Sequence, residues 1–522
     1  MLKDGKAWWG ILIADQNQEH LGWVYIVNKY YKDPLYKRYK WWIVISILIL
    51  GLGLRLYRLG DNLFWFDEVG VAVAAEQPSL PEALAVSQSY IMSMPLDYAI
   101  AWGVARLSQS ERILRLPSAI WGTLTLLAVY FLYQEITNEY TALLGMFLLA
   151  LTPIHIRYSQ ELKFYAPLVF FYVVASYFAL ISVRKKQSLL WGAFLIITMT
   201  GILFHVYTAL VLVNLTLWVV FTSNKTILDQ RLWKSFTFST CFISIFTAMA
   251  ILLFGKSPSY QSDLFAFESP IQIFLGGLGG IPIFPSTGSG FIFGGLCMVF
   301  AIVGLAITLS KNSDRFRFAI PISILLQVLL IISGDIVKKY FAVSRQLLML
   351  VPFMILLTAI GVEGIVKHFT ESTKRQPRSR SISLFLALII FSIAATPVLS
   401  QYYQTKRVDT LAVVNWLSDH WKNNQTIYIH PGYESFTYSY YLGKWGSTKD
   451  NRGQLMKITE SLFPLNLNSC QDNLPDANYL ITNIVNDQQA SCLKSEGFNP
   501  TYISPSNVAQ PQIIWHNIKN PD

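Results

Sequence analysis

Charged residues are scarce in this chain. Of its 522 residues, 14% are Asp, Glu, Lys or Arg and 53% are hydrophobic, whereas soluble domains carry about 25% charged residues. The deficit is concentrated in apolar runs such as 42–54, 143–151 and 353–360. Runs of about 18 to 20 apolar residues match the hydrocarbon core of a bilayer. The composition therefore argues against a soluble multi-domain enzyme.

Cysteine is also scarce, with four residues and no Cys-X-X-Cys spacing. Without a His/Cys cluster, the sequence gives no indication of a zinc site. Cys241 and Cys297 lie in apolar runs, where we expect them to be buried packing residues. Cys470 and Cys492 lie in the polar tail. A disulfide between these two and a pair of free thiols are equally open interpretations.

Residues 1–40 also show little of the pattern that is typical of a cleavable signal sequence. Residues 1–40 are polar, aromatic and basic, and no short apolar stretch among them precedes a small-residue cleavage site. We therefore expect the first apolar run, 41–56, to be a retained spanning helix.

Hydropathy predicts a mainly α, polytopic transmembrane bundle of about eleven spans. The predicted spans are residues 41–56, 116–135, 141–154, 166–183, 188–204, 207–222, 235–254, 291–310, 318–334, 347–366 and 381–400. Residues 97–107 are also apolar. Their short length and the charges of Asp97 and Arg106 favour a helix lying in the membrane interface.

The net charge of +10 lies largely in short loops between these spans. With this span count, the basic segments 29–40, 184–186, 225–234, 311–317 and 367–380 all fall on one side. Basic loops mark the cytoplasmic side, which predicts a cytoplasmic N-terminal segment, 1–40. The excess charge thus reports membrane orientation and indicates no nucleic-acid partner.

The chain divides into three predicted regions. After the N-terminal segment, a transmembrane module covers residues 41–400 and includes a long first outer loop, 57–115. Residues 401–522 are polar, with a helix pattern at 411–421 and strand patterns at 426–430 and 478–482. This alternation predicts a small α/β domain, which the span count places on the extracytoplasmic side.

Two acidic segments on the predicted outer face are candidates for chemistry. Asp67 and Glu68 follow Trp65 and Phe66 just beyond the first span, and acids in an apolar frame are candidates for base catalysis. The alternative is a solvated turn with two ordinary carboxylates, which the spacing alone favours. The second segment, 153–167, is a polar island that carries Glu161 and Tyr165 four residues apart, a spacing that shares a helix face. A capping loop with interfacial aromatics is the competing interpretation.

Two further clusters lie on the same predicted face. His205 and Tyr207 form a short outer turn, where a lone histidine is more often structural than a ligand. Lys338, Lys339 and Arg345 lie near the outer end of a span, against the orientation bias. They suggest an anion such as a phosphate, and simple snorkelling is the alternative.

The order of these motifs resembles the GT-C superfamily of integral-membrane glycosyltransferases, in particular the bacterial branch related to protein O-mannosyltransferases and aminoarabinose transferases. The resemblance covers residues 40–400. Its motifs are Arg58-Leu59-Gly60, Phe66-Asp67-Glu68, Arg115-Leu116-Pro117-Ser118, the segment from Ser159 to Tyr165, His205-Val206-Tyr207 and Arg345.

The resemblance implies an enzyme of the bacterial plasma membrane that acts in cell-envelope glycosylation. It would transfer a hexose or pentose from a polyprenyl-phosphate donor to a lipid, glycan or protein hydroxyl at the extracytoplasmic face. The implied catalytic residues are Asp67 as general base, with Glu68 and Glu161. The implied substrate-binding residues are Arg115, Lys163, Tyr165, His205, Tyr207, Lys338, Lys339 and Arg345, the last beside the donor phosphate. No cofactor is indicated, and dependence on a divalent metal stays open.

The chain departs from the family pattern in three places. Lys163 stands where relatives commonly have arginine, and lysine cannot make the same bidentate contact. Ser93-Met94-Pro95-Leu96 replaces a His-Pro-Pro element of the first outer loop. The tail holds no Trp-Trp-Asp motif, which disfavours an oligosaccharyltransferase. The rival functions are a flippase or transporter of lipid-linked sugars, and a membrane scaffold that presents the tail.

Overall fold

The computed structural model describes most of the chain from residue 34 onward. Outside the described residues are 1–33, 90–93, 223–229, 255–288, 311–314, 339–343, 373–376, 409, 421–424, 426, 431–436, 439, 442–476, 484–486, 505–507, 511 and 520–522. The chain forms two compact units, Met1–Ile49 and Leu50–Asp522. Helix α3 (Pro34–Leu56) begins in the first unit and ends in the second.

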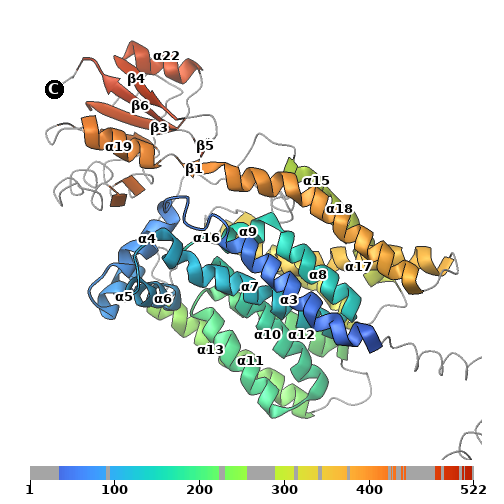
Figure 1. Ribbon diagram of the computed structural model, residues 1–522. Helices are drawn as coiled ribbons and strands as arrows, with labels where there is room; N and C mark the ends of the chain where they lie inside the picture. Colours follow the sequence, from blue (N-terminus) through green and yellow to red (C-terminus); the bar gives the residue numbers. More distant parts are fainter. Residues whose placement is uncertain are drawn as a thin grey trace, which may run out of the picture. The chain divides into compact units, whose positions relative to one another are not determined.

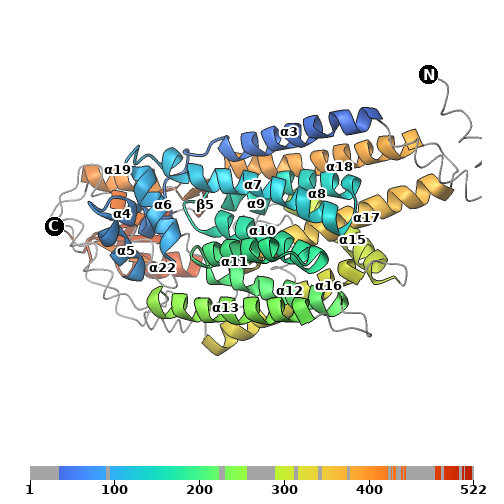
Figure 2. The same cartoon turned by 90° about the horizontal axis from the view of Figure 1, so that it is seen from below.

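The second unit is built on a bundle of membrane-spanning helices (Figures 1 and 2). Among the described residues, seven helices are long and apolar enough to cross a bilayer. They are α7 (Glu111–Ile136), α10 (Tyr165–Lys185), α13 (Gln230–Phe254), α15 (Ser289–Leu309), α16 (Arg315–Lys338), α17 (Val351–Ser372, preceded by the 3₁₀ turn η2, Ser344–Leu350) and α18 (Pro377–Gln404).

Three shorter apolar helices complete the bundle: α8 (Glu139–Leu151), α11 (Ser188–Ile202) and α12 (Val211–Thr222), which follows the 3₁₀ turn η1 (Val206–Leu210). With α3, they give every one of the eleven predicted spans a helix. The chain is an integral membrane protein with the predicted mainly α fold, and each span differs from its prediction only at its ends.

Burial differs strongly between the helices. α10 and α17 are largely buried inside the protein, whereas α13, α16 and α18 expose apolar side chains such as Phe242, Leu329 and Ile393. Exposed apolar side chains on a spanning helix face lipid. Cys297 is buried on α15, as predicted, but Cys241 is exposed on α13. The prediction that Cys241 is buried is therefore wrong, because apolar sequence alone does not distinguish a lipid-facing position from a core position.

The pair α15 and α17 packs with unusually close backbones. A Cβ atom added at Gly304 would lie 1.9 Å from the carbonyl oxygen of Leu357, and one added at Gly361 would lie 1.9 Å from that of Phe300. Small residues permit this approach between membrane helices. The two glycines therefore fix the position of α17, the helix that follows Arg345.

A buried polar network joins α10, α12 and α16 within the bundle. Tyr172 donates to Gln327 at 2.6 Å, and Asn214 donates to Tyr172 at 3.0 Å and to Ser176 at 2.9 Å. Ser323 donates to the Asn214 side-chain oxygen. Polar groups inside a bilayer need internal partners, so this network specifies how the three helices pack.

The first loop folds into three short helices, α4 (Phe66–Ala75), α5 (Leu80–Ser89) and α6 (Pro95–Ala105). α6 has 11 residues, about half the length that a span requires. Pro95 occupies its first turn, where a missing N–H does no harm. A further short helix, α9 (Pro153–Tyr158), lies between α8 and α10.

The tail contains a four-stranded sheet of order β2-β3-β6-β4. Its strands are β2 (Ile427–His430), β3 (Tyr479–Asn483), β6 (Gln512–Asn517) and β4 (Phe498–Ile503); β2 and β3 are parallel, and the other pairs are antiparallel. A separate parallel pair joins β1 (Lys406–Val408) to β5 (Val508–Gln510). The predicted helix and two strands are present as α19 (Thr410–His420), β2 and β3.

Each face of the four-stranded sheet is covered by a helix. Val413 and Leu417 of α19 pack with Ile429 and Ile481, and Leu493 of α22 (Asp487–Ser495) packs with Trp515 on the other face. Cys492 of α22 is disulfide-bonded. Cys470 lies outside the described residues, so their pairing stays a prediction.

The tail also shares an apolar core with the first loop. One buried cluster contains Val69 and Ala101 from α4 and α6 together with Tyr438 and Ile514 from the tail. The backbone N–H of Phe64 donates to the Tyr441 hydroxyl at 2.6 Å. The segment that leads into α4 is therefore held in part by the tail.

Candidate active site

The adjacent acids Asp67 and Glu68 lie in the first turn of α4. Trp65 is the N-cap residue, and its N–H donates to the Glu68 carboxylate at 3.3 Å. Carboxylates in the first turn of a helix interact favourably with its dipole. The two neighbouring side chains point to different partners, which gives them different chemical environments.

Asp67 forms an ion pair with Arg345 of η2. Nη1 of Arg345 donates to Oδ2 of Asp67 at 2.7 Å, across 278 residues of sequence. The side chains of Arg345 and Asp67 are 20% and 14% exposed, so the pair is reachable from solvent. The guanidinium of Arg345 lies 5.8 Å from the centroid of the Trp65 ring. The structure thus joins the first loop to the late arginine.

Lys163 lies beside this pair. Its Nζ donates to the backbone oxygen of Asp67 at 3.1 Å and lies 5.6 Å from the centroid of the Phe164 ring. Burial by itself lowers the pKa of Lys163. The surrounding Tyr98, Asp67 and Asp97 raise that pKa by more, so its net pKa is above the usual value. The ammonium is therefore charged at neutral pH.

Glu68 is engaged in a buried ion pair with Arg115 of α7. Nε and Nη2 of Arg115 donate to the two carboxylate oxygens at 2.8 and 2.6 Å, and the N–H of Leu162 donates to Oε1 at 2.6 Å. The side chains of Arg115 and Glu68 are 5% and 1% exposed.

The remaining donors of Arg115 bind three carbonyl oxygens of the first loop. Nη1 donates to Leu59 at 3.2 Å and Asn62 at 2.6 Å, and Nη2 donates to Leu63 at 3.1 Å. A guanidinium has five N–H groups, and all five are used here.

Glu161 belongs to a second, neighbouring group. Arg157 donates to its carboxylate at 3.2 Å, and both side chains are 7% exposed. A cavity of about 60 Å³ opens beside the pair. The residues that line it include Arg58, Trp65, Glu68, Arg115, Arg157, Glu161 and Tyr402.

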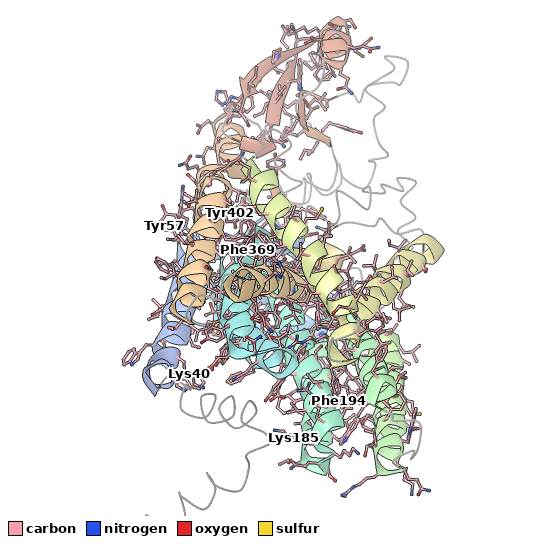
Figure 3. The ribbon with its side chains drawn as sticks, turned by 90° about the vertical axis from the view of Figure 1, so that its right-hand side faces the viewer. Lys40, Tyr57, Lys185, Phe194, Phe369 and Tyr402 are labelled. Atoms are coloured by element: carbon pink, nitrogen blue, oxygen red, sulfur yellow. The ribbon has the colours of Figure 1, made fainter. Side chains whose placement is uncertain are left out.

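Gln160 connects this cavity to the end of α18. Its Nε2 donates to the backbone oxygens of Arg55 and Tyr57 at 2.9 and 2.8 Å, and its Oε1 accepts from the Tyr402 hydroxyl at 2.7 Å. Figure 3 shows Tyr402 and Lys185 at opposite ends of the bundle. The candidate site and the basic loop 184–186 therefore lie at opposite ends of the spanning helices.

Tyr165 lies between the two acidic groups. Its hydroxyl is within electrostatic reach of Arg345, Asp67 and Glu161. Its ring lies 4.6 Å from that of Tyr158 and 4.7 Å from that of Phe164. The two predicted acidic segments and the late arginine thus surround one tyrosine at the start of α10.

His205 and Tyr207 form the predicted turn, in which His205 is the N-cap of η1 and Tyr207 lies inside η1. The Nδ1 atom of His205 accepts from the N–H of Tyr207 at 3.2 Å, and the imidazole stacks on the Phe164 ring at 4.4 Å. Burial and the nearby Lys163 ammonium lower the pKa of His205 to about 3. The imidazole is therefore neutral at physiological pH and forms part of an aromatic wall beside Lys163.

Lys338 and Lys339 cannot be placed at the site. Lys338 is the last residue of α16, and its side chain is not among those described. Lys339 lies outside the described residues. Their role as phosphate ligands stays a prediction. Metal binding finds no support in the described part of the chain, where no group of three or more His, Cys, Asp or Glu side chains could hold an ion.

Asp97, which the sequence motifs do not single out, lies close to this group of residues. It lies in the first turn of α6, within electrostatic reach of Lys163. Burial, opposed in part by Lys163, raises the pKa of Asp97 to about 6. Its signal in the sequence is an ionisable residue in an apolar helix, a pattern that also argues against a membrane span there.

Comparisons with known proteins agree with this architecture. Residues 93–251 match the family described as dolichyl-phosphate-mannose-protein mannosyltransferase. That range contains Asp97, Glu161, Lys163 and His205, and excludes Asp67 and Arg345. No protein of curated function matches the chain in sequence.

Solved membrane proteins share the fold at low sequence identity. ArnT from Cupriavidus metallidurans in the apo state has a TM-score of 0.54 at 10% identity, over 91% of this chain and 98% of that one. The same protein bound to undecaprenyl phosphate has a TM-score of 0.52 at 12% identity, over 92% and 98%.

The oligosaccharyltransferase AglB from Archaeoglobus fulgidus, in complex with an inhibitory peptide and a dolichol-phosphate, has a TM-score of 0.51 at 12% identity, over 92% of this chain and 74% of that one. By its match over residues 93–251 and its architecture along nine-tenths of its length, the chain has the fold of the GT-C superfamily of integral-membrane glycosyltransferases, as its motifs predict.

Proposed function

We propose that the chain transfers a sugar from a polyprenyl-phosphate donor to an acceptor hydroxyl at the extracytoplasmic face of the membrane. The observation that carries the proposal is the 2.7 Å ion pair between Asp67 and Arg345, with Lys163 beside it. The neighbouring cavity is lined by Tyr402, which Figure 3 shows at the end of the bundle opposite Lys185. A cation suited to a phosphate and a carboxylate suited to a hydroxyl therefore meet in one accessible place. The names of the similar proteins, which cite dolichyl and undecaprenyl phosphates, support the same donor class.

In the proposed reaction, Arg345 binds the donor phosphate. A guanidinium that binds this phosphate leaves Asp67, whose carboxylate is then available to the acceptor hydroxyl. The acceptor oxygen attacks the anomeric carbon as its proton passes to Asp67, and the bond from that carbon to the phosphate oxygen breaks. The bonding electron pair leaves with the polyprenyl phosphate, and the anomeric configuration inverts. Arg345 stabilises the charge that develops on the leaving phosphate.

Glu68 and Arg115 have a supporting role in this proposal. The carboxylate of Glu68 accepts two hydrogen bonds from Arg115 and one from Leu162, and Arg115 has no N–H left for a ligand. They hold the start of α4 against α7 and the segment after α9, and so position Asp67. Glu161 lines the neighbouring cavity, and Tyr165 is within electrostatic reach of both Asp67 and Glu161.

Release of free polyprenyl phosphate from a labelled polyprenyl-phosphate sugar tests the reaction. We expect Asp67→Asn to lower this release by about 10² to 10⁴, the usual contribution of a general base, with membrane insertion unchanged. The matched control is Glu82→Gln, an exposed carboxylate on α5, which should retain wild-type activity. Near wild-type release by purified Asp67→Asn protein would exclude the base role.

The donor role of Arg345 is tested by substitution with alanine and lysine. Arg345→Ala should lower kcat by about 10² to 10³, by analogy with a lost oxyanion donor. Arg345→Lys keeps the charge but loses the planar fork of the guanidinium, so its kcat should lie between those of the wild type and Arg345→Ala.

A lipid-linked sugar flippase would move the donor intact. Movement of the donor without any release of polyprenyl phosphate would therefore favour that alternative.

The proposed sidedness is tested separately. An alkaline phosphatase domain fused after residue 522 should be active in a bacterial host, because alkaline phosphatase folds only outside the cytoplasm. An inactive fusion, together with an active fusion after residue 372, would reverse the proposed orientation.

A further inference from the structure

Asp97 is a half-buried residue whose carboxylate has unused hydrogen-bonding capacity. Its Oδ2 atom is buried and has no hydrogen-bond partner among the residues that the structure describes. Buried polar atoms are nearly always paired, and a buried carboxylate is the more costly to leave unpaired. Asp97 is in the first turn of α6, but the N-cap of that helix is Met94, which makes no side-chain capping bond. Helix capping therefore does not account for Asp97.

Lys163 offers the complementary donors. Its ammonium carries three N–H groups, and the described residues take one of them, in the 3.1 Å bond to the Asp67 oxygen. Lys163 is also within electrostatic reach of both Asp97 and His205. An acceptor and a donor, each with free capacity, thus lie near one another directly beside the Asp67 backbone.

Aromatic rings line one side of Lys163, whose Nζ lies 5.6 Å from the centroid of the Phe164 ring. Phe164 and His205 stack at 4.4 Å, and Tyr207 meets His205 edge-on at 4.7 Å. Binding pockets commonly combine such apolar and aromatic walls with a few polar groups that fix orientation. A sugar ring matches this combination because it presents C–H groups on its faces and hydroxyl groups at its edges.

The charges of the pair also distinguish sugar from phosphate. The carboxylate of Asp97 repels an anion, and together with the Lys163 ammonium it sums to zero charge. The guanidinium of Arg345 forms its 2.7 Å ion pair with Asp67, and in the proposed reaction it exchanges this partner for the phosphate. The phosphate is therefore better matched to Arg345, and uncharged hydroxyl groups are better matched to Asp97 and Lys163.

We propose that Asp97 and Lys163 form the subsite for the transferred sugar, in which Asp97 accepts a hydrogen bond from one sugar hydroxyl and Lys163 donates to another. This inference rests on the proposed function and adds to it the residues that recognise the sugar ring. Asp97 is in this account a specificity-determining residue, and Asp67 remains the base.

The test compares a lipid phosphate with and without a sugar. The affinities of undecaprenyl phosphate, undecaprenyl-phosphate mannose and undecaprenyl-phosphate glucose are measured for the purified full-length protein and its variants. Asp97→Asn should weaken binding of the preferred sugar lipid about tenfold, because one hydrogen bond to a charged group is lost. Binding of undecaprenyl phosphate should change by less than about twofold, since its only head group is the phosphate. Arg345→Ala should weaken all three lipids, and Glu82→Gln none.

The outcomes separate the two proposals. If the wild-type protein binds none of the lipids, the proposed function fails, and the subsite fails with it. If the wild-type protein binds all three, and Asp97→Asn weakens the sugar lipids no more than undecaprenyl phosphate, the subsite is wrong while the function stands. Lys163→Met provides a second variant, which should also weaken binding of the sugar lipids more than binding of undecaprenyl phosphate. Equal binding of the bare and sugar-linked lipids by the wild-type protein would also overturn the subsite.

Discussion

The buried ion pair between Glu68 and Arg115 gives a sharp prediction about stability. Arg115→Met removes the guanidinium and leaves the Glu68 carboxylate, 1% exposed in the native protein, without its two charged hydrogen bonds. Removing one partner of a buried ion pair costs about 3–5 kcal/mol. The five hydrogen bonds of Arg115 hold three loop carbonyl oxygens as well, so the upper part of this range is expected.

Thermal unfolding of the purified protein in detergent measures the effect. The matched control is the exposed pair Arg58–Asp61, whose side chains are 38% and 50% exposed. Asp61→Asn should cost less than about 1 kcal/mol, and its melting temperature should stay near that of the wild type. Arg115→Met should melt several degrees lower and lose sugar transfer, since the start of α4 carries Asp67.

A double-mutant cycle isolates the pair. Glu68→Leu combined with Arg115→Met removes both charges, so the double variant should be more stable than Arg115→Met alone. The reasoning would be refuted if Arg115→Met melted at the same temperature as Asp61→Asn. It would be refuted equally if the two single effects simply added.

Three further predictions address other parts of the molecule. Asp97→Asn should raise the melting temperature at pH 7.5, because burial raises the pKa of Asp97 to about 6 from the usual 3.8 of an aspartate, which corresponds to about 3 kcal/mol against the ionised form. This cost exists above pH 6 and disappears below about pH 4, so a gain of equal size at pH 4 would contradict it. Tyr441→Phe removes the acceptor of the Phe64 N–H and should speed hydrogen exchange at residues 64–68; unchanged exchange would show that the tail does not hold this segment. Asn214→Leu should lower the melting temperature by breaking the network of α10, α12 and α16. The control is Thr216→Val, because the exposed hydroxyl of Thr216 donates to a carbonyl oxygen of its own helix; it should leave the melting temperature unchanged. Equal losses of melting temperature in Asn214→Leu and Thr216→Val would count against the network.

The sequence predicted the membrane architecture because hydropathy reports directly on it. All eleven spans coincide with helices, since a spanning segment must satisfy its backbone internally. The ends were less predictable. α7 begins at Glu111 rather than near 116, because Ser110 caps it and accepts from the Ile113 N–H. In the tail, β4 contains Pro500 and a register shift, which hide a strand from pattern reading.

The meeting of Asp67 with Arg345 follows from motif order and shared membrane side. The burial of Glu68 could not be predicted in this way, because it depends on Arg115, 47 residues away, and on the Leu162 N–H. Two adjacent acids look equivalent in sequence, and only long-range contacts distinguish the reachable one from the buried one. The sequence does not single out Asp97 for the same reason, because only the fold brings Asp97 within electrostatic reach of Lys163.

The apolar core that the tail shares with α4–α6 has a consequence for protein engineering. Residues 403–522 expressed as a free fragment would expose to water the apolar side chains that face the first loop, such as Tyr440, which packs edge-on against Phe64, and large exposed apolar patches promote aggregation. A chimera that exchanges this tail for that of another transferase would have to exchange α4–α6 with it. Sequence changes in the two segments are therefore coupled, although about 300 residues of membrane helices and loops separate them along the chain.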